Sequence, residues 1–200
     1  YDKTPTIFIE NKLLYPHFFN APVQSIGSLN AELIIVGLAP GVKGANQTGR
    51  PFTGDHAGDL LYQTLSIFGF IEGIYKARID DGMKLVNCRI TNAVKCVPPK
   101  NKPNAAEVSN CGQYLVNELF NMPKVKVILA LGGLAHGAVL SALGERKSRK
   151  KFGHKNLHLL SNGLRLINSY HCSRYNTNTG RLTTEMFELV FSDIVKIIKE

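Results

Sequence analysis

The chain has 200 residues, of which 44% are apolar and 20% are charged. This composition is typical of a single globular domain over residues 1–200, and it excludes a disordered or repetitive chain. Its 24 Lys and Arg outnumber its 15 Asp and Glu, so the net charge is +9. Such a charge indicates a polyanionic partner, because Lys and Arg gain affinity when they neutralise phosphates and release counterions.

The cysteines are too few and too scattered for a disulfide framework, at Cys88, Cys96, Cys111 and Cys172. They predict a reducing, cytoplasmic setting. The longest apolar stretch, residues 125–144, contains Lys126 and His136, and two glycines interrupt it. It therefore predicts a buried strand that turns into a helix, and we expect a monomer that does not bind a membrane.

Four short apolar runs predict strands, at residues 32–38, 89–94, 125–131 and 164–170. Segments with helical spacing alternate with them, at residues 56–70, 104–120 and 183–200. This alternation predicts an α/β fold with a parallel sheet that helices cover on both faces. Ligands of such sheets bind beyond the carboxyl ends of the strands, so we expect the site in the segments after residues 38, 94 and 170.

The segment after the first strand is the glycine-rich loop "GLAPGVKGANQTGRPFTGD", residues 37–55. It does not match a phosphate-binding Walker loop, because Lys43 is followed by Gly44 and not by Ser or Thr. The dinucleotide fingerprint is absent as well. What remains is a rigid turn at residues 39–41, whose backbone N–H groups can approach a ligand at the sheet edge.

Four residues in these segments each allow two interpretations. Asp55 is a helix N-cap or a carboxylate aimed into a cleft. Phe52 is a core residue or a platform for a stacked base. Asn92 lies in an apolar strand, so a ligand or a neighbouring backbone group must satisfy its amide. His171, at the end of the last strand, is a structural histidine or a catalytic one.

The basic stretch "ERKSRKKFGHK", residues 145–155, carries six Lys or Arg and one Glu. It allows two interpretations, a solvated surface loop or a specific phosphate contact.

Three stretches together resemble the motifs of a known family: "GLAPG…GRPFTGD", "ITNAVKC.PP.NKP" followed by Cys111, and "YH.SRYNT.TGRLT". In order and spacing they are similar to those of family 5 (type b) of the uracil-DNA glycosylase superfamily, across residues 20–185. The resemblance implies a three-layer α/β/α sandwich with a central four-stranded parallel sheet. It also implies a DNA repair enzyme that flips uracil, and other deaminated bases such as hypoxanthine, out of single- or double-stranded DNA. The enzyme then hydrolyses the glycosidic bond and leaves an abasic site.

The resemblance also implies contacts with the flipped base. Phe52 would stack on uracil, and the Asn92 amide would accept from N3–H and donate to O4. Backbone groups of the glycine-rich loop would hold O2 and the neighbouring phosphate, at Gly37, Ala39, Pro40 and Gly41.

Two residues would act on the bond that breaks. His171 would stabilise the uracil anion at O2. Related families carry a polar residue where this chain has Ala39, so Asp55 becomes the candidate that polarises water or stabilises the sugar cation. The segment 173–181 would enter or flank the minor groove, and its candidate DNA contacts are Arg174, Tyr175, Asn176 and Arg181.

Relatives in this superfamily hold a [4Fe–4S] cluster with four cysteines. Cys96 and Cys111 match the later pair, with fourteen residues between them. At the expected position of the first pair the chain has Tyr1 and Thr4. Either this protein lacks the cluster, or the other ligands lie before Tyr1. The chemistry itself requires no iron.

Two other functions are compatible with the same features. One is a non-catalytic nucleic-acid-binding protein that keeps the fold and the basic charge. The other is a glycosylase that acts mainly on a different lesion. A panel of oligonucleotides with different lesions separates the three.

Overall fold

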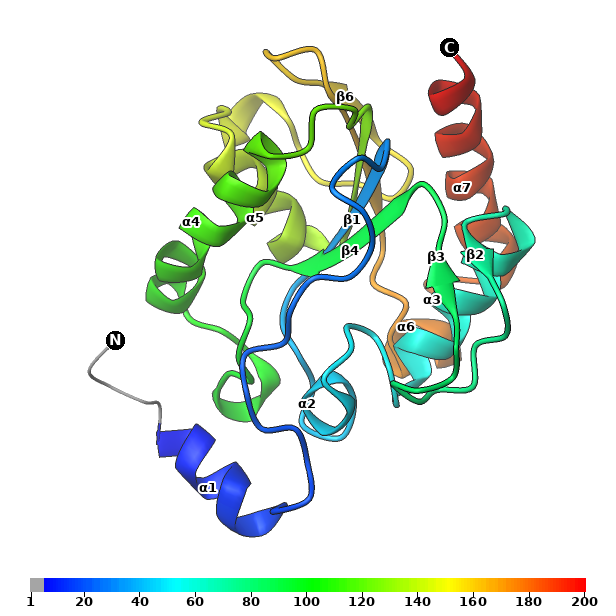
Figure 1. Ribbon diagram of the computed structural model, residues 1–200. Coiled ribbons are helices and arrows are strands. Elements are labelled where there is room, and N and C mark those ends of the chain that lie inside the picture. The colour runs from blue at the N-terminus through cyan, green and yellow to red at the C-terminus, as the bar shows by residue number, and fades with distance from the viewer. Residues whose placement is uncertain (1–5) are drawn as a thin grey trace.

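The computed structural model describes residues 6–200, and it describes side chains from Glu10 onward. Within these residues the centre is a five-stranded sheet with helices on both faces (Figure 1). The strands lie in the order β4 (Cys88–Asn92), β1 (Leu33–Gly37), β5 (Val127–Leu131), β7 (Arg165–Ser169) and β6 (Leu157–Leu159). The first four are parallel and coincide with the four predicted strands. The α/β/α sandwich is therefore confirmed.

β6 is a strand that the sequence did not predict. It pairs antiparallel with β7, with Leu157 opposite Ile167 and Leu159 opposite Arg165. The expected four-stranded parallel sheet therefore has a fifth, antiparallel strand at one edge. β6 is only three residues long and both of its leucines are exposed, so it lacks the buried apolar run that marks the other strands.

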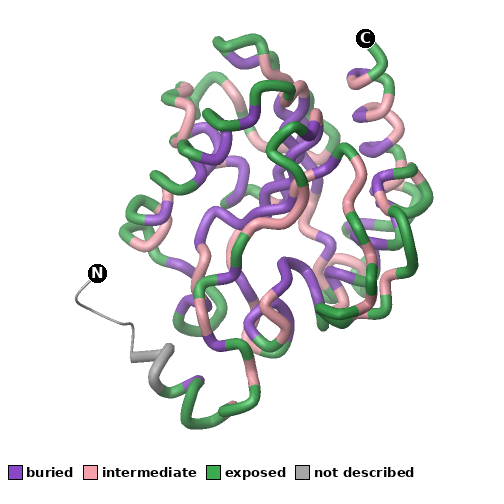
Figure 2. The backbone as a smooth tube through the Cα atoms, viewed as in Figure 1, coloured by how far each residue is buried: buried purple, intermediate pink, exposed green. Residues whose placement is uncertain are grey.

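Two helices cover each face of the sheet: α3 (His56–Ile67) and α7 (Thr184–Lys199) on one, α4 (Ala105–Phe120) and α5 (Gly133–Ala142) on the other (Figure 1). Successive side chains of a strand point to opposite faces. On β1, Leu33 and Ile35 join the core beneath α3 and α7, whereas Ile34 and Val36 join the core beneath α4 and α5. The central strands are therefore buried along their length (Figure 2).

Polar side chains fix where three of these helices begin. Asp55 accepts a hydrogen bond from the Gly58 backbone N–H at 3.1 Å, as expected for the N-cap of α3. Asn104 and Glu107 form a reciprocal capping box at the start of α4. Thr183 caps α7 in the same way as Asp55 caps α3.

Short elements fill the connections: α1 (Thr6–Leu14), α2 (Ala45–Thr48), β2 (Ile71–Glu72), β3 (Lys84–Leu85), α6 (Arg174–Asn178), and single 3₁₀ turns at Pro99–Asn101 and Lys147–Arg149. α2 and α6 lie near the carboxyl ends of the parallel strands, whereas β2 and β3 form a small hairpin beside α3 (Figure 1). Among the described residues, no helix is long and apolar enough to cross a membrane.

Candidate active site

A cavity of about 360 Å³ lies at the carboxyl ends of β1, β4 and β7. Its lining includes six of the predicted site residues, Ala39, Gly41, Phe52, Asp55, Asn92 and His171. The sequence missed the rest of the lining, which is Leu38, Ala45, Ala57, Asn101 and Ser173. The fold thus brings the segments after residues 38, 94 and 170 together, as parallel-sheet topology requires.

Two glycines let the polar side chains approach the loop backbone. Gly37 does not line the cavity itself, but a Cβ on it would collide with the Asn92 amide oxygen and the Phe52 ring. A Cβ on Gly44 would collide with the Asp55 carboxylate. These glycines are therefore required for close packing rather than for flexibility.

Phe52 has an unusual backbone conformation, with φ at 52° in the left-handed region. Such a conformation costs a non-glycine residue on the order of 1–3 kcal/mol and persists only where neighbouring contacts enforce it. The side chain is 7% exposed, and its ring lies 6.0 Å from the His171 ring at an interplanar angle of 30°. Phe52 is therefore a core residue that also lines the cavity, and its role as a platform for a stacked base stays a prediction.

Asp55 likewise combines the two roles that the sequence allowed. Its Oδ1 accepts the capping bond from Gly58. Its Oδ2 lies beside the backbone of Gly41 and Gly44, and the residue lines the cavity. One oxygen thus fixes the carboxylate in place while the other remains available to a ligand or a water molecule.

Asn92 is the last residue of β4 and is 4% exposed. Among the side chains that the structure describes, none forms a hydrogen bond with its amide, whose atoms are open to the cavity. A buried amide without a partner costs stability, unless a ligand or water satisfies it. The Asn92 amide therefore faces the cavity, and its pairing with a ligand edge stays a prediction.

His171 follows β7 and faces the same cavity. Burial lowers the pKa of its imidazole below the usual 6.5, because burial disfavours the charged form, whereas the nearby Asp55 charge acts in the opposite direction. This shift favours the neutral ring, which carries one N–H donor. The Asn176 amide donates to the His171 carbonyl at 2.8 Å and holds this segment in place.

Cys172 is fully buried, and its Sγ donates a hydrogen bond to the Ala57 carbonyl at 3.3 Å. Burial raises the pKa of this thiol to about 12, so it stays protonated. Cys172 thus links the His171 segment to the first turn of α3 and has no nucleophilic character.

None of the predicted DNA contacts lines the cavity. Arg174 and Tyr175 begin α6, and Tyr175 is 72% exposed. The Arg181 guanidinium lies over the Tyr170 ring, 4.7 Å from its centroid. Asn176 differs from these residues, because its amide is already engaged by His171.

The basic stretch 145–155 is partly committed to the fold. Lys155 forms an ion pair with Asp193 at 3.2 Å, and Lys150 forms one with Glu145 at 3.5 Å. These two lysines fit the interpretation as a surface loop, and the stretch contributes no residue to the cavity.

A second cavity of about 420 Å³ adjoins the first one and shares Gly41, Asp55 and Asn101 with it. Tyr15 and Lys43 complete its wall together with Val42 and Gly44. Lys43 is exposed, and the Tyr15 ring stacks on Phe18 with their centroids 4.7 Å apart. Asn101 belongs to a segment where a site was expected, but no motif pointed to Tyr15. Pro40 is buried and lines neither cavity.

Cys111 lies close enough to Cys96 to affect the pKa of the Cys96 thiol. Burial raises the pKa of the Cys96 thiol, and the neighbouring Cys111 raises it further. An iron–sulfur cluster requires four ligands. Within residues 6–200, no group of three His, Cys, Asp or Glu side chains could hold a metal ion. The described cysteines therefore do not fit a cluster by themselves, and Tyr1 and Thr4 lie outside the described residues.

Comparison with known proteins agrees with this geometry. The family model of the uracil DNA glycosylase superfamily matches residues 24–195. The chain belongs to this superfamily. It is 43% identical to the type-5 uracil-DNA glycosylase of Thermus thermophilus over 170 residues. These residues make up 85% of the chain and 77% of that protein. The type-5 enzyme of Pyrobaculum aerophilum is 43% identical over 168 residues, covering 84% of the chain and 73% of that enzyme.

Type-4 relatives are more distant. The type-4 uracil-DNA glycosylase of Thermotoga maritima is 30% identical over 171 residues, which cover 85% of the chain and 78% of that protein. The predicted resemblance to family 5 is therefore confirmed.

Proposed function

We propose that this protein is a DNA repair enzyme that hydrolyses the N-glycosidic bond of deoxyuridine in DNA and leaves an abasic site. The observation that carries the proposal is the Asn92 side-chain amide, which has no hydrogen-bond partner among the described residues and lies in one cavity with the Phe52 ring and the Asp55 carboxylate. The type-5 relatives and the positive net charge support it.

Base recognition rests on Asn92 and Phe52. Uracil presents a donor at N3 and an acceptor at O4, and an amide can pair with both at once. Cytosine has an amino group in place of O4, so the amide N–H would face another donor. A site with buried polar groups matched to one edge rejects the other edge strongly. Phe52 offers its face to the flipped ring.

Bond cleavage rests on His171 and Asp55. As the C1′–N1 bond breaks, its electron pair leaves with uracil, and the sugar acquires oxocarbenium character. The neutral His171 ring donates its N–H toward O2, where negative charge develops. The free Oδ2 of Asp55 stabilises the cation or orients the water whose oxygen bonds to C1′, and the proton that this water loses passes to the Asp55 carboxylate or to the departing uracil anion. Ala39 has no polar group to share this task.

The DNA strand would pass the mouth of the cavity. Arg174 and Tyr175 of α6 would fill the gap that the flipped nucleotide leaves in the duplex. This insertion costs the free energy of unstacking the neighbouring bases. Arg181 is proposed to contact the backbone. Asn176 is proposed to hold His171 through its existing bond rather than to contact DNA. In the second cavity, Lys43 would contact a flanking phosphate.

We extend the proposal to hypoxanthine, which presents an N–H beside a carbonyl group on its pairing edge, as uracil does. Asn92 can bind that edge in the same way. Either DNA form can supply the substrate, and flipping is easiest from single strands or mismatches.

The test uses oligonucleotides that carry one uracil, one hypoxanthine, one mispaired thymine or no lesion. We expect alkali-labile cleavage at uracil, and we expect Asn92→Ala to reduce the rate by about a hundredfold or more. Asn92→Ala should unfold at nearly the same temperature as the wild type, because its amide has no partner to lose. Binding without abasic product would favour a non-catalytic protein, and product only at another base would favour a different lesion.

A further inference from the structure

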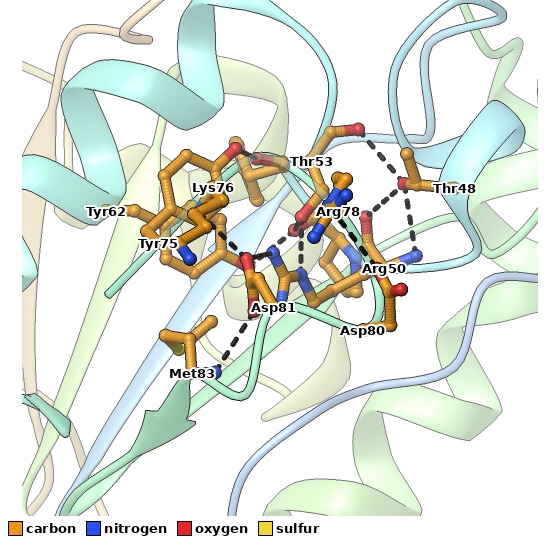
Figure 3. A network of polar contacts seen from close by, with 12 residues as sticks. Thr48, Arg50, Thr53, Tyr62, Tyr75, Lys76, Arg78, Asp80, Asp81 and Met83 are labelled. Carbon is orange, nitrogen blue, oxygen red and sulfur yellow. Dashed lines mark hydrogen bonds and ion pairs between the residues drawn. The ribbon is translucent and has the colours of Figure 1, made fainter. Parts of the chain in front are cut away.

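Arg50 lies outside both cavities and is buried in a network of polar contacts (Figure 3). It is 4% exposed and forms a two-pronged ion pair with Asp81, with N–O distances of 2.8 and 2.7 Å. The Asp81 side chain is fully buried. Asp81 also accepts hydrogen bonds from the backbone N–H groups of Lys76 and Met83, at 3.0 and 3.1 Å.

Asp81 belongs to the hairpin connection between β2 and β3, whereas Arg50 belongs to the glycine-rich loop. The ion pair thus joins two segments that are thirty-one residues apart in the sequence. A buried pair of charges adds little stability compared with apolar residues, but it strongly favours one geometry. Here the Arg50–Asp81 ion pair fixes the loop that carries Phe52.

The network converges on both sides of Phe52. The Arg50 Nε donates to the Thr53 hydroxyl at 2.8 Å, and the Tyr62 hydroxyl donates to the Pro51 carbonyl at 2.7 Å. The Tyr75 hydroxyl contacts the Phe52 carbonyl itself at 3.4 Å.

The two tyrosines also hold the guanidinium. Their rings stack on each other with centroids 4.3 Å apart, and the Arg50 guanidinium carbon lies 5.5 Å from the Tyr62 ring and 5.3 Å from the Tyr75 ring. Cation–π contacts of this kind favour a single position of the guanidinium.

Phe52 needs such support, because its left-handed backbone is unfavourable for a residue with a side chain. We infer that Arg50 and Asp81 are positioning residues, which hold the Phe52 ring in place as the stacking surface for the flipped base. The β2–β3 hairpin thereby contributes to the site although none of its residues lines the cavity. This inference rests on the proposed function.

The test is a double-mutant cycle on excision under single-turnover conditions. Asp81→Asn keeps the shape of the side chain and removes the charge that Arg50 needs. We expect a loss of about tenfold to a hundredfold in the excision rate, as for other small displacements of catalytic geometry. In a Phe52→Ala background the same substitution should change the rate by less than about twofold, because the ring is gone. The dissociation constant for uracil-containing DNA should stay within about twofold.

Two further variants separate positioning from general stability. Glu32→Gln removes an ion pair of 3.0 Å with Lys126 at the amino end of the sheet, far from the site, and should leave the excision rate unchanged. Tyr75→Phe removes one hydroxyl and can replace Asp81→Asn in the cycle if Asp81→Asn does not fold. We expect it to lower the excision rate by about threefold.

An unchanged rate in a folded Asp81→Asn or Tyr75→Phe variant would overturn the inference, and so would an equal loss in both backgrounds. A wild-type protein without glycosylase activity would instead overturn the proposed function.

Discussion

The Asp55 carboxylate accepts a hydrogen bond from the Gly58 backbone N–H at 3.1 Å, and the same residue lines the cavity. A helix cap and the proposed catalytic group therefore share one side chain. The capping bond at the start of α3 fixes the carboxylate before the substrate binds. Its second oxygen can therefore face the substrate without a further loss of side-chain entropy. The two roles can be separated, because asparagine caps helices about as well as aspartate but does not carry a negative charge.

We expect Asp55→Asn to lower uracil excision by about 10²- to 10⁴-fold, the usual contribution of a general base. Its free energy of unfolding should fall by less than about 1 kcal/mol, because the cap is retained and only the charge at the helix end is lost. Asp55→Ala should lose the same activity and about 1 kcal/mol more. Single-turnover kinetics measure the excision rate of each variant, and urea unfolding measures its free energy of unfolding. An active Asp55→Asn variant would remove the residue from the mechanism.

The pKa of His171 offers an independent check of the pocket. Burial lowers it below 6.5, whereas the Asp55 charge raises it. Removal of that charge in Asp55→Asn should therefore lower the His171 pKa further. An NMR titration of the ring protons, assigned with His171→Gln, measures both midpoints. A wild-type midpoint above 6.5, or an upward shift in Asp55→Asn, would contradict this electrostatic description.

The same shift affects stability. A histidine whose pKa is lowered on folding binds fewer protons in the native state than in the unfolded chain. His154 and His158 share the direction of the shift, because burial lowers the pKa of both. The contribution of these histidines to the free energy of unfolding is therefore complete above pH 6.5. It is lost as the pH falls below 6.5 and through their lowered native-state pKa values. Urea unfolding between pH 7.5 and pH 5 should show this loss, and it should be smaller in His171→Gln. A flat profile would contradict it.

Much of the site was predictable because of two properties of parallel sheets. Their strands are buried on both faces, so residues 32–38 and 125–131 stand out as apolar runs. Their carboxyl ends meet at one edge, so Asp55, Asn92 and His171 had to converge even though they lie far apart in the sequence.

The remaining features depend on contacts that have no local signal. Asp81 is an ordinary acidic loop residue until the hairpin folds it against Arg50. Tyr15 reaches the second cavity from a segment that precedes the sheet. The β6 strand pairs with the open edge of β7, and its three residues are too few to predict a strand. Partners distant in sequence decide these features.

Gly37 tests the packing of the cavity wall. A Cβ at this position would collide with both the Asn92 amide oxygen and the Phe52 ring, so Gly37→Ala should displace the two side chains that are proposed to contact the base. We expect a loss of about a hundredfold in the excision rate, as for misplacement of about 1 Å. Gly112→Ala in α4 is the matched control, because a Cβ there meets nothing within 4 Å. That control should keep full activity and gain about 0.5–1 kcal/mol of stability. Equal rates in both variants would show that the wall tolerates the methyl group.

Lys43 tests the path of the DNA. It is exposed at the second cavity, beside Asp55 and Tyr15, where a flanking phosphate would pass. A lysine that neutralises one phosphate releases about one counterion, so Lys43→Ala should reduce the slope of log K against log salt concentration by about 1. Its excision rate at saturating enzyme should stay near that of the wild type, because no reacting group is removed.

Lys124 is the matched control for this measurement. It is an exposed lysine before β5, at the opposite end of the sheet from both cavities. Lys124→Ala should leave the salt slope unchanged, because no phosphate lies near it. Fluorescence anisotropy with a labelled uracil oligonucleotide, titrated at several salt concentrations, gives both slopes. If the two alanine variants have the same slope, the strand does not pass Lys43, and the second cavity is not part of the DNA path.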